Sequence, residues 1–437
     1  MKSQKGGTEM KRIFAVLLIL LACLFTGCTG AYSGVNELLR APRLAGPQNE
    51  IQKALTYYLG ETPQLKYPQH GDTLSPFLFG DWNGDGVEDA AALYVSGAKG
   101  QNVHLAILEQ TTNGWVVTQE REGLAFQVDS VATAGMSGEG GMQLLVGYLS
   151  ASGEKYLTVY AYQDETLTVV MEQAYSQYEL QDITGSGLID LILIGPETGD
   201  GLQLQMLTTI DGEFIKLQEL QLSEQQFVSC EGLHISKSAD GSYYLVLDGS
   251  TGTGGNLASM VLRYNAMHQQ LETVVPPSGV DIYTETQRYS SLLKSMDIDG
   301  DGSVEIPREL TDTGGLLTVN RLAFLTWMDY TSETKVQKSF GIADLENGYY
   351  LQLPAEWQGK ILVTDGSQPG SWEIRGLDGE ILYLQVRVVD STVQSNSYFR
   401  LGNIGSKRVQ ARIWKANLDE DGKSLLTKDL VDGFLIL

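Results

Sequence analysis

The sequence contains very little cysteine, which excludes a disulfide-stabilised fold. Only three cysteines occur in 437 residues. Cys23 and Cys28 lie near the N-terminus, and Cys230 is the one cysteine in the body of the chain. A single thiol has no intrachain partner, so the body of the protein must fold without disulfide bonds.

Positive charge is scarce as well. The chain has 30 Lys and Arg against 54 Asp and Glu, and its formal net charge is -24. A surface of this sign repels the phosphates of nucleic acids and anionic lipid headgroups, so neither is expected as a partner. The same surface suits an extracellular, cation-rich setting.

The signatures of common enzyme classes are absent. The sequence has no Gly-x-Ser-x-Gly, His-Glu-x-x-His, Cys-x-x-Cys or Gly-x-x-x-x-Gly-Lys motif. Its four histidines are scattered, at His70, His104, His234 and His268. Carboxylates are plentiful, but no pair stands out as a glycosidase pair. The sequence therefore predicts no catalytic residues, and it leaves a polysaccharide hydrolase or lyase open as an alternative.

Long apolar runs are missing except near the N-terminus. Two basic residues precede the apolar run 13–21, which leads to Leu24-Phe-Thr-Gly-Cys28. This stretch resembles the signal peptide and lipobox of a bacterial lipoprotein. The resemblance implies a signal peptide over residues 1–27 and a lipid on Cys28. The protein would then be tethered through this lipid to the outer face of the cytoplasmic membrane, with a Gram-positive-type envelope favoured.

Two alternatives to this N-terminus remain open. A competing cut lies before Cys23, and a plain transmembrane anchor is possible, although the apolar run is short against the roughly 20 residues that span a bilayer. Residues 28–47 follow as a flexible tether interrupted by prolines.

Residues 48–59 are predicted to form a helix, and residues 60–69 a linker. Ile51, Ala54, Leu55, Tyr58 and Leu59 recur at helical spacing, and a glycine follows them. One face of this helix is apolar, so we expect it to dock on the first domain.

Two stretches have the spacing of a calcium-binding loop, with oxygen-bearing residues at loop positions 1, 3, 5 and 9 and Gly at position 6. The Asp81 loop (81–89) offers the side chains of Asp81, Asn83, Asp85 and Asp89 and the carbonyl of Val87. It is predicted to bind a structural calcium ion, and an acidic turn without metal is the alternative.

The Asp297 loop (297–305) repeats the pattern. Its predicted ligands are the side chains of Asp297, Asp299, Asp301 and Glu305 and the carbonyl of Ser303. An EF-hand would need a Glu at position 12 entering a helix, and these loops have Ala92 and Arg308 there. The sequence therefore disfavours an EF-hand at both sites.

Weaker copies of the loop lie between these two. We name them by their first residue: the Gly135 loop (135–143), the Asp182 loop (182–190) and the Ser236 loop (236–244). In the Asp182 loop, Thr184 and Ser186 replace two charged ligands, so we expect hydrogen bonds rather than an ion to hold this turn. The five starts are 47 to 61 residues apart. Each of the first four loops precedes two or more short apolar runs, which predict strands.

The Asp81 loop followed by Ala-Ala-Ala-Leu-Tyr-Val resembles an FG-GAP or VCBS-type repeat, the calcium-loop blade of integrin-α-like propellers. The resemblance implies a β-propeller-like domain of about five recognisable blades over residues 70–345. In that family the loop links two strands of one blade, an ion stiffens the loop, and ligands usually bind elsewhere on the propeller.

The chain is expected to end in a small α+β domain over residues 346–437, with strands at 349–353, 360–364, 381–389 and 409–414 and a closing helix over 425–437 capped by Thr427. The run 348–357 is faintly similar to PsbP-like domains of secreted lipoproteins.

These expectations define a mainly β protein with a short N-terminal helix, a propeller-like repeat domain and a small α+β domain. Its expected role is recognition of an extracellular protein or glycan by a calcium-stabilised, non-enzymatic lipoprotein. A polysaccharide-acting enzyme on a propeller scaffold and a structural spacer are the alternatives.

Overall fold

The computed structural model describes residues 46–138, 141–163, 166–197, 199, 201–210, 213–223, 226–252, 255–275, 279–311, 314–331, 335–418 and 424–437. The described residues from Ile51 to Leu437 belong to one compact unit. The predicted signal peptide, the lipidation site Cys28 and nearly all of the predicted tether lie outside the described residues.

The structure is mainly β, with 52% strand and 7% helix. Its only long helix among the described residues is α3 (Gly46–Leu59), close to the predicted range. Ile51 and Leu55 are fully buried, and Gly60 ends the helix with a φ of 72° while donating to the carbonyl of Thr56. The apolar face therefore docks as predicted, and the Tyr58 hydroxyl adds a 2.9 Å hydrogen bond to Glu120 of the first sheet.

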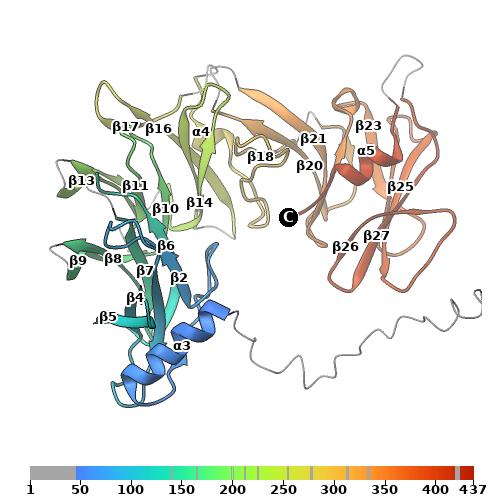
Figure 1. Cartoon of the computed structure of the whole chain (residues 1–437). Helices are drawn as coiled ribbons and strands as arrows, with labels where there is room; N and C mark the ends of the chain where they lie inside the picture. The colour runs from blue at the N-terminus through green and yellow to red at the C-terminus, as the bar shows by residue number, and fades with distance from the viewer. Residues whose placement is uncertain are drawn as a thin grey trace, which may run out of the picture. The chain divides into compact units, whose positions relative to one another are not determined.

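Four antiparallel sheets follow one another along the chain, and we call them the first to fourth repeat sheets (Figure 1). The first contains β1 (Gln64–Leu65), β2 (Phe77–Gly80), β3 (Asp89–Val95), β4 (His104–Thr111) and β5 (Gly114–Glu122). The second contains β6 (Gln127–Ala134), β7 (Gln143–Leu149), β8 (Lys155–Gln163) and β9 (Thr166–Tyr175). The third contains β10 (Gln177–Gln181), β11 (Asp190–Ile194), β12 (Leu202–Ile210) and β13 (Glu213–Leu222). The fourth contains β14 (Ser229–Lys237), β15 (Tyr243–Ser250), β16 (Leu257–Asn265) and β17 (Gln270–Thr273).

These sheets confirm the predicted strands and the position of the loops. In each repeat sheet, the loop joins the edge strand to the strand beside it, as in the pairs β2–β3 and β6–β7. Ala92, at position 12 of the Asp81 loop, is buried inside β3 and not in a helix. The EF-hand alternative is therefore excluded for this loop.

Two further sheets complete the chain. The short helix α4 (Ile282–Glu285) precedes them. The fifth sheet has the order β18 (Ile306–Glu309), β20 (Leu322–Asp329), β21 (Val336–Asp344), β22 (Tyr349–Leu353) and β28 (Phe434–Ile436). The sixth has the order β19 (Leu316–Leu317), β23 (Ile361–Asp365), β24 (Ser371–Gly376), β25 (Leu382–Asp390), β27 (Lys407–Ile413) and β26 (Phe399–Ile404).

The fifth sheet includes strands on both sides of residue 345, where the sequence predicted a domain boundary. β21 pairs with β22 through Phe340↔Leu353, and β22 pairs in turn with β28 through Leu351↔Phe434. Pro307 lies in β18, an edge strand of this sheet, where a proline is tolerated because the missing amide faces away from the ladder.

The predicted closing helix over 425–437 is wrong in extent. A helix, α5, covers only Thr427–Asp432, its N-cap is Leu426 rather than Thr427, and a strand follows it. Gly433 donates to the carbonyl of Asp429 and ends the helix, which lets the last residues pair with β22. The residues after Gly433 therefore pair with the free edge of β22 instead of continuing the helix.

Each sheet packs against the next through a hydrophobic cluster. Every interface between successive sheets contains fully or nearly fully buried residues from both sheets. Examples, in chain order, are Leu93 with Val146, Leu145 with Leu193, Leu204 with Leu247, Val246 with Ile306, and Phe340 with Trp372. No cluster formed by described residues joins the first repeat sheet to the fifth or sixth, so no closed ring of sheets is seen.

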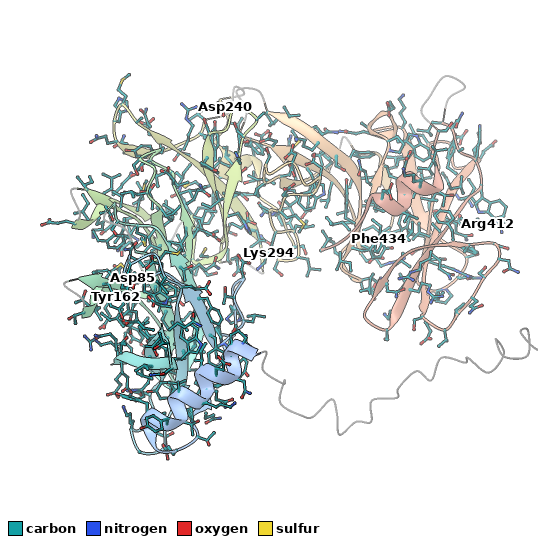
Figure 2. All side chains as sticks on the ribbon, in the orientation of Figure 1. Asp85, Tyr162, Asp240, Lys294, Arg412 and Phe434 are labelled. Carbon is teal, nitrogen blue, oxygen red and sulfur yellow. The ribbon has the colours of Figure 1, made fainter. Side chains whose placement is uncertain are left out.

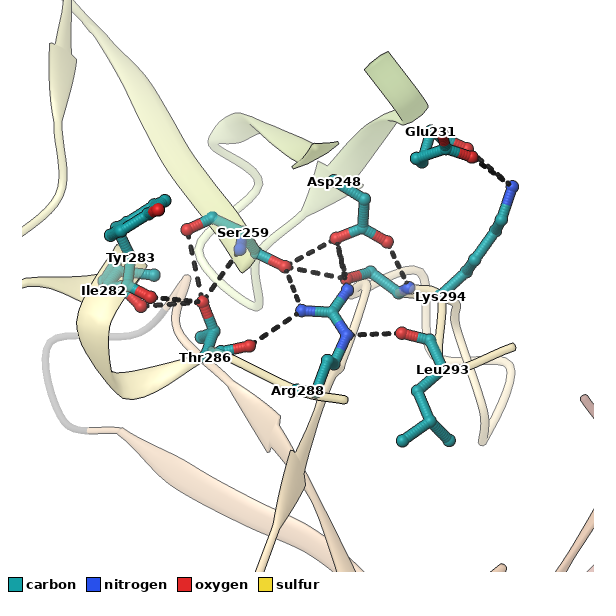
Figure 3. A network of polar contacts seen from close by, with 10 residues as sticks. Glu231, Asp248, Ser259, Ile282, Tyr283, Thr286, Arg288, Leu293 and Lys294 are labelled. Carbon is teal, nitrogen blue, oxygen red and sulfur yellow. Dashed lines mark hydrogen bonds and ion pairs between the residues drawn. The ribbon is translucent and has the colours of Figure 1, made fainter. Parts of the chain in front are cut away.

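A buried ion pair fixes the segment that leads into the Asp297 loop (Figure 3). Arg288 and Asp248 are both fully buried, and Nη2 lies 2.8 Å from Oδ1. Arg288 Nη1 also donates to the Ser259 hydroxyl at 2.8 Å, and the Ser295 amide donates to Asp248 Oδ2 at 2.6 Å. Burial acts to raise the pKa of Asp248, but the Arg288 charge and these hydrogen bonds outweigh it and lower the pKa.

We predict that Arg288→Met lowers the free energy of unfolding by about 3–5 kcal/mol, because it leaves the Asp248 carboxylate buried without its counter-ion. Urea unfolding followed by circular dichroism measures this loss. The double variant Arg288→Met/Asp248→Leu should recover only part of it, because Asp248→Leu leaves the Ser295 amide without its acceptor. As a control, Lys216→Met breaks an exposed pair with Glu219 and should cost less than about 1 kcal/mol. A cost for Arg288→Met as small as the control would contradict the assigned role.

Candidate functional site

Three of the repeat loops share one hydrogen-bond framework, in which the carboxylate at position 1 accepts backbone amides from the middle of the loop. In the Asp81 loop, Asp81 Oδ1 accepts from Gly84 at 2.7 Å and Oδ2 accepts from Gly86 at 2.9 Å. Asp297 accepts from Gly300 and Gly302 at the same distances. The equivalent carboxylate of the third loop does the same with the amides of Ser186 and Gly187.

The side chain at position 9 accepts the amide of position 2 in four loops. The oxygen–nitrogen distances are 3.3 Å for Asp89 and Trp82, 2.6 Å for Gln143 and Met136, 2.8 Å for Asp190 and Ile183, and 3.0 Å for Glu305 and Ile298. All four position-9 side chains are buried. In the Gly135 loop the uncharged side-chain amide of Gln143 therefore accepts the same hydrogen bond as the carboxylates of the other loops.

Hydrogen bonds from backbone amides to the side chains two residues earlier complete the framework. In the Asp81 loop, Asn83 Oδ1 accepts the Asp85 amide at 2.9 Å and Asp85 Oδ1 accepts the Val87 amide at 2.7 Å. Asp299 and Asp301 repeat this pattern. In the Asp182 loop, hydroxyl oxygens take over: the Ser186 hydroxyl accepts the Leu188 amide at 3.3 Å. Hydrogen bonds therefore contribute to this turn, and the absence of an ion from it stays a prediction.

The loops also bond to one another across neighbouring sheets. The Met142 amide donates to the Asp81 carbonyl at 3.1 Å, and the Ile189 amide donates to the Gly135 carbonyl at 3.0 Å. The Lys237 amide donates to the Gly302 carbonyl at 2.9 Å. The loops therefore join consecutive sheets, as well as the two strands within each sheet.

Three acidic side chains of the Asp297 loop are close enough to share a cation. Oxygens of Asp297, Asp299 and Glu305 lie within 4.8 Å of one another. Glu305 is fully buried, and among the described residues its Oε1 has no hydrogen-bond partner. A buried carboxylate oxygen of this kind fits a hard cation, which prefers oxygen ligands.

A lysine lies at the same cluster. Lys338 of β21 contacts Asp301 directly, and its ammonium is 3.5 Å from Asp299 and 4.0 Å from Glu305. Burial raises the pKa of Glu305 to about 7.

In the Asp81 loop no lysine of the described residues pairs with the loop, and burial raises the pKa of Asp89 to about 6. Asp85, labelled in Figure 2, marks this loop.

A polar cavity of about 640 Å³ lies beside the second and third repeat sheets, and we call it the central cavity. It is lined by residues 129–133 of β6, residues 175–180 at the end of β9 and along β10, Lys155, and the loop 70–73 that precedes β2. β6 and β10 are the edge strands of their sheets. None of these residues belongs to the predicted calcium sites.

Asp129 is the centre of a hydrogen-bond network in this cavity. Its side chain is 4% exposed, Oδ1 lies 2.8 Å from His70 Nδ1 and 3.1 Å from Lys155 Nζ, and Oδ2 accepts from the Tyr175 hydroxyl at 2.6 Å. Burial acts to raise the pKa of Asp129, but these three partners outweigh burial and lower the pKa.

Local backbone structure directs Asp129 toward the cavity. The pairing of β6 with β7 shifts register between Val128 and Ser130, so Asp129 is the extra residue of a β-bulge. The carbonyl of Asp129 accepts amides from Gln69 and His70 at 3.0 and 2.8 Å, which holds the 70–73 loop against β6.

Gly147 of β7 makes room for the tyrosine of this network. A Cβ at Gly147 would lie 2.1 Å from the Tyr175 hydroxyl oxygen and 2.7 Å from the Ser130 hydroxyl oxygen. Those two hydroxyls are 3.3 Å apart, and Ser130 also donates to the Tyr178 hydroxyl at 3.3 Å. This network was not predicted from the sequence. A glycine inside the apolar run 144–148 was the available signal, because an isolated glycine in a strand often marks a close approach.

Glu179 of β10 differs from Asp129 in its surroundings. It is half-buried, and burial, together with the negative charge of Asp72, raises its pKa to about 7. A second cavity of about 470 Å³ adjoins the central cavity and shares Lys155 and residues 175–177 with it. It adds Glu154 and Glu197 to the lining.

The other histidines are not part of these cavities. The side chain of His104 is 7% exposed beside Glu120, and burial lowers the pKa of His234. His268 is exposed and pairs with Glu272. No helix in the described part of the chain is long and apolar enough to cross a membrane.

Comparison with known proteins gives little. No protein-family model and no curated protein matches the chain. Among solved structures, the crystal structure of a candidate 6-phosphogluconolactonase from Bacteroides uniformis matches with a TM-score of 0.32 at 12% identity, covering 73% of this chain and 93% of that chain. A TM-score this low carries no argument about fold or function.

We predict a pH-dependent contribution of Glu179 to stability. Its pKa is raised from 4.5 to about 7 in the folded protein, so the unfolded chain ionises first as the pH rises. The contribution is fully present below pH 4.5 and is lost as the pH rises through about 7.

Urea unfolding with a metal chelator present, at several pH values between 4.5 and 8, tests this prediction. Glu179→Gln should remove this part of the decline, whereas Glu213→Gln, an exposed change at the start of β13, should follow the wild type. If the free energy of unfolding of the wild type and of Glu179→Gln changes equally with pH, Glu179 is not buried as the structure shows and the prediction is wrong.

Proposed function

We propose that the chain is a lipid-tethered, non-enzymatic recognition protein, anchored through Cys28 to the outer face of the cytoplasmic membrane. Its repeat sheets form a propeller-like domain related to FG-GAP repeats. Two features support the propeller-like assignment: in each repeat sheet of four or five antiparallel strands a loop joins the edge strand to its neighbour, and successive sheets pack against each other through shared hydrophobic clusters.

The observation that carries the recognition function is the central cavity. Its volume of about 640 Å³ falls in the range of small-molecule sites, roughly 300–1,000 Å³. Asp129, Tyr175 and Ser130 hold one another in place, so polar groups are pre-organised for a ligand. A structural spacer has no need of such a cavity, which makes that alternative less favoured.

One observation favours a polysaccharide-acting enzyme as the second candidate. The cavity brings together two carboxylates with opposite pKa shifts, Asp129 lowered and Glu179 raised. Such pairs can divide the roles of base and acid between them. However, both oxygens of Asp129 are already engaged by His70, Lys155 and Tyr175. An oxygen held in this way is a poor proton acceptor, so binding without catalysis is the first candidate.

We further propose that calcium ions bind in the Asp81 and Asp297 loops as structural ions. The proposed ligands are the position 1, 3, 5 and 9 side chains and the position 7 carbonyl of each loop. The unpartnered oxygen of Glu305 supports the second site. Because both loops bond to a neighbouring sheet, an ion that stiffens them would also stiffen the contact between sheets.

Isothermal titration of the purified full-length protein with calcium should show two sites. Asp81→Ala and Asp297→Ala should each remove one, and chelation should lower the melting temperature, since a ligand at 100 times its Kd adds about 2.7 kcal/mol. Asp182→Ala is the matched control, because the hydroxyl-based third loop should not bind calcium. Lys338→Met should tighten the second site by removing a competing cation. No heat and no change in melting temperature would refute the calcium proposal.

A glycan array with the full-length protein tests the recognition function. We expect binding to a restricted set of glycans, and weaker binding by His70→Gln, which removes one partner of Asp129. His268→Gln is the matched control, since this histidine also pairs with a carboxylate but lies outside the cavity. Absence of any glycan binding would contradict recognition of a glycan, and shortening of a bound oligosaccharide during incubation would favour the enzyme.

A further inference from the structure

One part of the central cavity is electrically balanced within the protein. Asp129 pairs with both His70 and Lys155, and the Tyr175 hydroxyl donates to its second oxygen. The Lys155 ammonium is held by this carboxylate, so it offers little free positive charge to an anionic ligand. A phosphate or a uronate is therefore a poor match for the cavity.

Another part of the lining carries negative charge without a cation. Glu179 is half-buried on β10, and Asp72 is the neighbouring charge that acts on it. Among the described residues, neither carboxylate has a hydrogen-bond or ion-pair partner. A half-buried carboxylate without a counter-ion is destabilising, and a cationic group from a ligand would relieve this cost.

The groups next to these carboxylates are hydroxyls and aromatic rings. Ser130, Tyr175 and Tyr178 form a chain of hydroxyl contacts along the cavity. Hydroxyls both donate and accept, so they complement a polyhydroxylated molecule, and tyrosine rings offer apolar faces to it. The adjoining cavity continues past Lys155 and Tyr175 and adds two more acidic residues. A ligand longer than one sugar fits this extent.

We infer that the central cavity binds an oligosaccharide bearing free amino groups. An ammonium group would lie against Glu179 and Asp72, and the sugar hydroxyls would contact Ser130, Tyr175 and Tyr178. This inference rests on the proposed recognition function and names the class of its ligand. Neutral and anionic sugars lack the group that the unpaired carboxylates require.

Two matched probes test the inference: the tetramer of β-1,4-linked glucosamine and its fully N-acetylated counterpart. Titration of the full-length protein should show at least about tenfold tighter binding of the amine tetramer, the factor expected for one charge-assisted contact. Glu179→Gln should remove that preference, and Asp72→Asn should reduce it. Glu213→Gln should leave it unchanged, and a thermal melt confirms that each variant is folded.

The outcomes separate the inference from the proposed function. Equal or tighter binding of the acetylated tetramer overturns the amine assignment and leaves glycan recognition standing. Amine-tetramer binding that Glu179→Gln and Asp72→Asn leave unaltered overturns the assigned position. Trilysine binding as tightly as the amine tetramer overturns the sugar assignment. No binding of either tetramer overturns the inference, and the glycan array decides separately whether any glycan is recognised.

Discussion

A buried side chain at loop position 9 accepts the backbone amide of position 2 in four of the five loops, and the arrangement of the first three repeat sheets depends on this contact. In these three sheets it closes the loop at the point where the edge strand passes into its neighbour. Asp89, Gln143, Asp190 and Glu305 all make it, although they differ in charge and length. The backbone of the Asp81 loop bonds to the Gly135 loop, that of the Gly135 loop bonds to the Asp182 loop, and the Asp297 loop bonds to the Ser236 loop. Position 9 is buried, so no water can replace its side chain as the hydrogen-bond acceptor. A position-9 side chain that cannot accept would therefore leave the position-2 amide unsatisfied.

This contact also bears on the central cavity. Residues 129–133 lie on β6 and residues 177–180 on β10, and each of these strands leads directly into a closed loop. The walls of the cavity are therefore fixed at one end by the loop framework. Calcium in the Asp81 loop would act on these walls indirectly, through the bond between the Asp81 carbonyl and the Met142 amide. In the proposed division of roles, the loops provide rigidity and the edge strands line the proposed ligand site, which lies apart from the two predicted calcium loops.

Local patterns in the sequence predicted the strands, the helix near residue 50 and the two acidic loops, because periodicity and turn chemistry act over a few residues. The cavity could not be predicted in this way. His70, Asp129 and Tyr175 are far apart in sequence, and a β-bulge, which no composition rule marks, places Asp129 among them. The closing helix was predicted too long for a related reason, since the strand that ends it pairs with β22, about 80 residues earlier. Both the cavity and the end of the helix therefore depend on contacts between residues that are far apart in the sequence.

Hydrogen exchange at the position-2 amides of Trp82, Met136, Ile183 and Ile298 tests the shared framework most directly. The account predicts slow exchange at all four without calcium, because a buried side chain accepts each amide. It also predicts that calcium slows exchange further only in the Asp81 and Asp297 loops. Fast exchange at Met136 and Ile183, in the loops without a predicted ion, would show that the side-chain contact does not hold the loops and would contradict the account.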